Sequence, residues 1–193
     1  LDASELPARD GGRFAGIVQQ EHGLPHWEEL DFEFDLMIAD VAAVALEYVH
    51  AGASRIIVHA SSPSAGKAIE ELSGLRDDDN INEGVAVGVA LGVKVSPELW
   101  ESVAEQFDFV QVMGIEHVGK QGEPLAHKAL QLIERLRHRY PHMPIQVDGG
   151  VRLENIKQLV AAGATRIVSG SAILGAEDAK AAYDALYTKA NAH

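Results

Sequence analysis

The chain contains the hexapeptide Ala51-Gly52-Ala53-Ser54-Arg55-Ile56 and repeats it almost unchanged as Ala162-Gly163-Ala164-Thr165-Arg166-Ile167. Each copy ends a stretch of helical periodicity and opens an apolar, β-branched stretch, so each indicates a corner between a helix and a strand. Convergence is the alternative, because any such corner favours Ala-Gly-Ala. The two copies lie about half a typical barrel chain apart, which favours a closed (β/α)8 barrel over an open doubly wound sheet.

Strands and helices alternate from residue 32 onward. The expected strands are apolar almost throughout, as in a parallel sheet that is buried on both faces, and they cover Phe32–Ile38, Arg55–Ala60, Val85–Leu91, Phe109–Ile115, Ile145–Asp148 and Arg166–Ile173. The expected helices cover Val41–His50, Ser64–Leu72, Pro97–Gln106, Leu125–Tyr140, Leu153–Ala161 and Ala176–Ala190. Six successive βα units predict an α/β fold, and a length of 193 residues predicts a single domain over 1–193.

Composition narrows the classes of partner. The formal net charge is −13, so phosphate backbones and anionic lipid repel the chain, and we expect neither a nucleic acid nor a membrane as partner. The longest apolar stretch, Gly84–Val93, is too short to span a bilayer. The chain has no cysteine, which excludes thiolate chemistry and fits a reducing compartment. We expect a cytoplasmic protein that forms a homo-oligomer and acts on a small molecule.

The most informative site signal is Ile145-Gln146-Val147-Asp148-Gly149-Gly150-Val151. The carboxyl ends of barrel strands form the active face, so Asp148 is expected to point into a pocket. Gly149 and Gly150 allow backbone N–H groups to approach an anion before the next helix. The alternative is that Asp148 caps an ordinary turn.

The next strand ends in a similar way. Gly170 and Ser171 offer a second pair of backbone donors and a hydroxyl group. Because the loops after the last two barrel strands commonly bind phosphate, the sequence predicts a phosphate-bearing ligand held by Gly149, Gly150, Gly170 and Ser171.

Two earlier strand ends also carry polar groups. Asp35 is a second carboxylate at a strand end, and His59 is either a pocket residue or a satisfied core histidine. Met37 and Met113 are candidates for lining the pocket, with ordinary packing as the alternative. The loop from Gly119 to Gly122, which includes Gln121, is either a mobile lid or a surface loop.

These motifs together resemble the ribulose-phosphate 3-epimerase family, a ribulose-phosphate-binding type of (β/α)8 TIM barrel. The resemblance covers residues 32–190 and rests on Asp35–Met37, Ala51–Ala53, Val58–Ala60, Val112–Gln121, Val147–Val151, Asn155, Ala162–Ala164 and Gly170–Ile173. Leu1 and Asp2 match the end of an earlier strand of the family, which implies a barrel that lacks its first βα unit.

The resemblance implies an isomerase of carbohydrate metabolism, in the pentose phosphate pathway. It would interconvert ketose phosphates of the D-ribulose 5-phosphate and D-xylulose 5-phosphate type, with Asp148 and Asp2 as the acid/base pair and a metal-stabilised enediolate. Asp2, Asp35 and Asp148 would hold the divalent metal ion (Mg, Mn, Fe or Zn), and Gly119, Gln121, Met37 and Met113 would contact the substrate. Asp35 replaces a histidine of the family, so the metal is either a harder ion such as Mg²⁺ or Mn²⁺, or has been lost.

Two alternatives stay open. One is a barrel like the hexulose-phosphate synthases and keto-gulonate-phosphate decarboxylases, although Met37 stands where those enzymes have a lysine. The other is a degenerate barrel that binds a sugar phosphate without catalysis.

Overall fold

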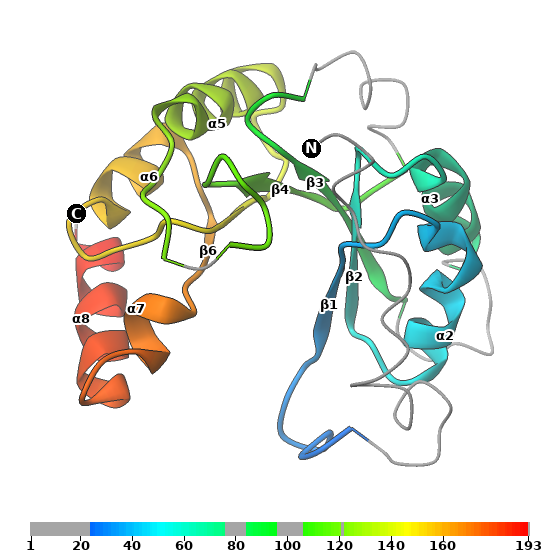
Figure 1. Ribbon diagram of the computed structural model, residues 1–193, viewed down its shortest axis with the longest axis horizontal. Coiled ribbons are helices and arrows are strands. Elements are labelled where there is room, and N and C mark those ends of the chain that lie inside the picture. Colours follow the sequence, from blue (N-terminus) through cyan, green and yellow to red (C-terminus); the bar gives the residue numbers. More distant parts are fainter. Residues whose placement is uncertain (1–23, 76–83, 96–105, 121, 193) are drawn as a thin grey trace. The chain divides into compact units, whose positions relative to one another are not determined.

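The computed structural model describes residues 24–75, 84–95, 106–120 and 122–192, and Figure 1 follows the chain through them. Two compact units divide these residues. The first runs to Ala90 and takes in residues 95 and 106–109, and the second holds Leu91–Lys94 and the chain from Val110 onward. Apart from Gln106, the predicted helix Pro97–Gln106 lies outside the described residues, and Asp2 and Gln121 do too.

The first unit contains three parallel strands in chain order, with their helices. The strands are β1 (Glu33–Leu36), β2 (Arg55–His59) and β3 (Ala86–Leu91), and the helical segments are the 3₁₀ turn η2 (Val41–Ala43), α2 (Ala45–His50) and α3 (Ala65–Gly74). The predicted helix Val41–His50 is therefore present but broken at Val44.

One face of this three-stranded sheet packs on helices. Ile56, Val58 and Val87 are fully buried, as is Ala68 of α3. The ring of Phe34 lies 5.1 Å from that of Tyr48 in α2. Figure 1 shows α2 and α3 lying along the same side of β2. This is the βα packing that the periodicity predicts.

The opposite face of the strands carries the polar side chains. Glu33 and Asp35 point to it from β1, and Arg55 and His59 point to it from β2, because alternate residues of a strand share a face. Gly88 of β3 lies on the same face, where a Cβ atom would overlap the buried ring of Phe109.

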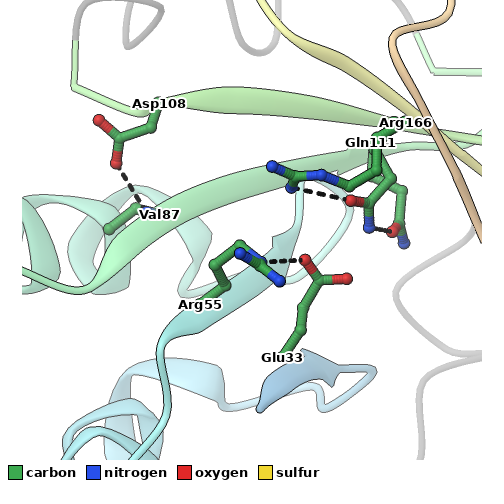
Figure 2. Close-up of polar contacts among 7 residues, drawn as sticks. Glu33, Arg55, Val87, Asp108, Gln111 and Arg166 are labelled. Carbon is green, nitrogen blue, oxygen red and sulfur yellow. Dashed lines mark hydrogen bonds and ion pairs between the residues drawn. The ribbon is translucent and has the colours of Figure 1, made fainter. Parts of the chain in front are cut away.

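Asp108 makes two hydrogen bonds with the backbone of Val87 in β3. The N–H of Val87 donates to Asp108 Oδ2 at 2.7 Å (Figure 2). The N–H of Asp108 donates to the Val87 carbonyl oxygen at 2.7 Å. The pair of bonds ties the segment before Phe109 to the strand.

The second unit repeats the pattern. Its parallel strands are β4 (Phe109–Met113, part of this unit from Val110), β5 (Ile145–Asp148) and β6 (Arg166–Val168), and its helices are α5 (His127–Arg139), α6 (Ile156–Ala162), α7 (Ser171–Leu174) and α8 (Ala179–Asn191). The outward side chains of β4 and β5 and the apolar sides of α5 and α6 are almost completely buried; they include Val110, Val112, Ile145, Val147, Ala129, Ile133 and Leu159.

The last predicted strand, Arg166–Ile173, is wrong in its second half. The strand ends at Val168, and Ser171 begins a four-residue helix. Gly170 accepts hydrogen bonds through its carbonyl oxygen from the N–H groups of Ile173 and Leu174, which closes a helical turn. A short apolar run fits either a strand or a helix, and here the turn at Gly170 decides.

No helix in the described ranges is long and apolar enough to cross a membrane.

Candidate functional site

The turn after β5 has the backbone shape that the Asp-Gly-Gly sequence predicts. Asp148 is the last residue of β5 and is half-buried. Gly149 and Gly150 follow with φ angles of 95° and 70°, in the left-handed region that favours glycine. The Asn155 side chain donates to the Gly150 carbonyl oxygen at 2.8 Å and accepts from the Arg152 N–H at 2.9 Å. Asn155 therefore fixes the turn from the far side.

Backbone from other parts of the second unit encloses this turn. The N–H of Gly114 donates to the Asp148 carbonyl oxygen at 2.6 Å, and a Cβ atom at Gly114 would overlap the Gly149 carbonyl oxygen. A Cβ atom at Gly150 would lie 2.7 Å from the backbone of Leu125. The turn is thus held by close backbone packing and not by long side chains.

The neighbouring strand places Met113 beside Asp148. Met113 pairs with Asp148 in the register of β4 and β5, and it is 1% exposed. Its sulfur accepts a hydrogen bond from the Gln111 side chain at 3.3 Å. Met113 is therefore packed into the strand end. Its predicted contact with a substrate stays a prediction.

The end of β6 brings Gly170 and Ser171 to the start of α7. Gly170 has a φ of −88°, and a Cβ atom there would meet no described atom within 4 Å. Neither backbone conformation nor close packing demands glycine at this position. The space in front of the residue is open, which is what a bound anion would need.

Ser169 is a polar residue that the sequence did not single out. Its hydroxyl is buried and has no hydrogen-bond partner in the described part of the chain. Such a group usually marks a place where water or a ligand completes the bonding. It lines a cavity of about 410 Å³ between β6 and α8, together with Arg166, Tyr183 and Tyr187.

A buried layer of polar side chains lies nearer the amino ends of the strands in the second unit. Gln146 donates to Gln111 Oε1 at 2.7 Å, and Arg166 donates to Gln146 Oε1 at 3.0 Å (Figure 2). These three residues are register partners, two positions before Met113, Asp148 and Val168 respectively. Sequence reasoning missed them, and their signal was a polar residue inside an otherwise apolar strand.

The first unit holds the other predicted carboxylate. Asp35 lies on β1 with 22% of its side chain exposed, and its Oδ1 is 2.7 Å from Nε2 of His59, which is 1% exposed. Met37 follows β1 and is half-buried. Glu33 lies two residues before Asp35 on β1, and its carboxylate accepts a hydrogen bond from the guanidinium of Arg55 at 2.9 Å (Figure 2).

The predicted lid after β4 is tied down at its base. His117 Nδ1 lies 3.0 Å from the Glu123 carboxylate, and the Arg152 side chain donates to the Gly122 carbonyl oxygen at 3.1 Å. Gly119 and Gly122 both have positive φ angles. These contacts fix both ends of the loop beside the Asp148 turn, and its role as a lid stays a prediction.

Only two of the three predicted metal ligands lie within the described residues. In the described ranges no three His, Asp or Glu side chains gather closely enough to hold a metal ion. Asp35 and Asp148 belong to different units, and Asp2 is outside the described residues. The described residues alone therefore do not complete a metal site, and the divalent ion stays a prediction.

Known proteins share this sequence pattern. A family model described as the ribulose-phosphate 3 epimerase family matches residues 16–174. The ribulose-phosphate 3-epimerase of Schizosaccharomyces pombe is 31% identical over 177 residues, which cover 92% of this chain and 73% of that protein. The Bacillus subtilis enzyme of the same name is 28% identical over 160 residues, covering 80% and 70%.

A solved structure gives the same fold. The crystal structure of KGPDC from Streptococcus mutans superposes with a TM-score of 0.62 at 16% identity, over 84% of this chain and 73% of that one. Parallel strands in chain order, joined by helices and carrying polar residues at their carboxyl ends, define a fold of the (β/α)8 barrel class.

Within that class, the chain belongs to the ribulose-phosphate 3-epimerase family. Its curated relatives are carbohydrate epimerases, so the family is one of enzymes in the isomerase class. The chain spans about two thirds of the length of the curated relatives it matches.

Proposed function

We propose that the protein is an epimerase of a ketose phosphate, of the D-ribulose 5-phosphate to D-xylulose 5-phosphate type. The observation that carries the proposal is the Asp148 carboxylate at the end of β5, directly before a glycine turn enclosed by backbone. Membership of the epimerase family supports the reaction class.

Asp148 is the proposed acid/base group. Epimerisation next to a ketone removes a proton from one face of the carbon and returns a proton to the other face, which takes two groups. The N–H of Gly114 bonds the Asp148 carbonyl oxygen at 2.6 Å, so the backbone that carries the carboxylate is fixed. Asp2, outside the described residues, is proposed as the second group.

The phosphate of the substrate is proposed to bind the glycine turns. The positive φ angles of Gly149 and Gly150 let their N–H groups face an anion, and the open space at Gly170 and the start of α7 offers further donors. Binding of the phosphate group, away from the reacting carbon, holds the substrate in place for proton transfer.

A divalent ion, when bound, supplies positive charge beside the oxygen that becomes negative during proton removal. Asp35 and Asp148, with Asp2, are the proposed ligands. Carboxylate ligands favour Mg²⁺ or Mn²⁺ over Zn²⁺.

Exchange of the C3 proton with deuterated water tests the proposal. Wild-type full-length protein, given ribulose 5-phosphate and Mg²⁺ or Mn²⁺, should incorporate deuterium at C3, and Asp148→Asn should slow the exchange by about 10²–10⁴. Binding of the phosphorylated sugar should survive in this variant. Absence of exchange on any pentulose or hexulose phosphate, with Mg²⁺, Mn²⁺, Fe²⁺ or Zn²⁺ supplied, would contradict the epimerase and favour a binding barrel.

A further inference from the structure

A chain of hydrogen bonds crosses the sheet of the second unit from β6 to β4. The Arg166 guanidinium donates to Gln146 Oε1 at 3.0 Å, and Gln146 Nε2 donates to Gln111 Oε1 at 2.7 Å (Figure 2). Gln111 Nε2 then donates to the sulfur of Met113 at 3.3 Å. This series, which we call the Arg166 chain, begins at a cation and ends at a thioether.

The two ends of the Arg166 chain fix its direction. A guanidinium can only donate hydrogen bonds, and a thioether sulfur can only accept them. Gln146 therefore presents its oxygen to Arg166 and its NH₂ group to Gln111. Gln111 in turn presents its oxygen to Gln146 and its NH₂ group to Met113. Exchange of oxygen and nitrogen in either amide would break two of these bonds at once.

Burial holds the members of the Arg166 chain in place. The side chains of Gln111, Gln146 and Met113 are each 1% exposed. A buried amide that gives up a hydrogen bond gains none from water in return. Any member that moved would also cost its neighbour a buried bond, so the three bonds stabilise one another.

The Arg166 chain ends beside the candidate acid/base group. Met113 and Asp148 are partners in the register of β4 and β5. Both lie on the face of the sheet that also carries Gln111 and Gln146, because alternate residues of a strand share a face. Met113 is thus the member of the chain that reaches the carboxyl ends of the strands, where Asp148 stands.

Met113 needs an anchor if its side chain is to keep one shape. A methionine side chain is unbranched and has three rotatable bonds, so packing alone leaves it adaptable. The hydrogen bond from Gln111 to the sulfur supplies a fixed point near the end of this side chain.

We propose that Arg166 is a positioning residue: through Gln146 and Gln111 it fixes the Met113 side chain as a wall beside the Asp148 carboxylate. The inference rests on the proposed function for the role of Asp148. A wall of fixed shape next to a proton-transfer group limits where the reacting carbon of the substrate can lie. Misplacement of that carbon by about 1 Å can cost about 10²-fold in rate.

The experiment follows the methyl group of Met113 by ¹³C nuclear magnetic resonance in the full-length protein. The chain has three methionines, and Met113→Leu identifies the signal of Met113. Arg166→Met removes the donor and keeps an apolar stem, and it should shift the Met113 signal toward that of a freely rotating methionine. Arg166→Lys keeps a cation with N–H donors and should restore most of the wild-type position. The signals of Met37 and Met143 should stay unchanged.

Arg137→Met is the matched control. It makes the same chemical change in the same unit, at a guanidinium that donates to the Gly163 carbonyl oxygen at 2.8 Å and takes no part in the Arg166 chain. A general loss of stability would move the Met113 signal equally in both variants. Equal shifts, or an unchanged Met113 signal in Arg166→Met, would overturn the proposal.

A measurement on the unsubstituted protein keeps the test independent of how the variants fold. The side-chain NH₂ protons of Gln111 and Gln146 should exchange with water far more slowly than those of Gln158, which is exposed on α6. Exchange as fast as that of Gln158 would show that the amides are not held, and the inference would fail.

Incorporation of deuterium at C3 of ribulose 5-phosphate tests the consequence for the reaction. Arg166→Met should slow the maximal rate about 10–100-fold and change the half-saturating sugar concentration by less than about twofold. A wild-type rate in Arg166→Met would overturn the inference. A wild-type protein without incorporation refutes the proposed epimerase, and the Met113 and glutamine signals then decide the Arg166 chain by themselves.

Discussion

Substitution of Gly150 by alanine tests whether backbone packing builds the candidate phosphate turn. The residue has a φ of 70°, and a new Cβ atom would lie 2.7 Å from the backbone of Leu125, which cannot move aside as a side chain can. The left-handed conformation costs about 1–2 kcal/mol for a residue with a Cβ atom, and overpacking costs about 1–3 kcal/mol more. The free energy of unfolding should therefore fall by about 3 kcal/mol.

Gly170→Ala is the control within the same candidate site. Gly170 has an ordinary φ of −88°, and a methyl group added there would have no described atom within 4 Å, so its unfolding free energy should stay within about 0.5 kcal/mol of wild type. Thermal unfolding followed by circular dichroism measures both variants, and a loss of about 3 kcal/mol corresponds to about 6–12 °C in a chain of this size. Equal melting temperatures for Gly150→Ala and wild type would refute the reasoning.

Three further predictions use other contacts. Arg137→Met should lower the free energy of unfolding in urea by about 2–3 kcal/mol, because Arg137 donates to the carbonyl oxygens of Gly163 at 2.8 Å and Pro141 at 2.7 Å; a loss below about 0.5 kcal/mol would contradict this. Gly88→Ala should cost about 1–3 kcal/mol through overlap with the Phe109 ring, and Phe109→Leu in the same chain should recover part of it. Gly170→Val should leave stability unchanged but weaken phosphate binding about tenfold or more in calorimetry, since one charge-assisted hydrogen bond is worth about 1.5–3 kcal/mol; equal binding would remove Gly170 from the site.

The positions of the strands could be predicted from the sequence, because each combines β-branched apolar residues with a glycine or polar residue at its end. The predicted strand Ile145–Asp148 has the same bounds in the structure. The predicted strand Arg166–Ile173 extends too far, because Ala172 and Ile173 fit either a strand or a helix. The hydrogen bonds from Ile173 and Leu174 to the Gly170 carbonyl oxygen make this segment helical.

The polar layer could not be predicted, because it depends on register. Gln111 and Gln146 are far apart in the sequence, and each alone is only a polar residue within a strand. The pairing of strands β4 and β5 makes them neighbours, and burial then requires that their amides bond to each other. The contact of His59 with Asp35 likewise depends on the pairing of β1 and β2. The sequence therefore indicated both residues as candidates but not the bond between them.

The glycine turn shows how few residues are needed to build this part of the candidate site. Gly114, Gly149 and Gly150 come from the ends of two neighbouring strands, and their backbones approach so closely that a Cβ atom on Gly114 or Gly150 would overlap backbone atoms. Because glycine has no side chain, the packing of main chain against main chain sets the direction of the N–H groups in the turn. The backbone that carries a carboxylate just before such a turn is held by the same packing. Chemistry that needs a proton-transfer group at a fixed distance from a bound anion can therefore be encoded by an aspartate and a few glycines.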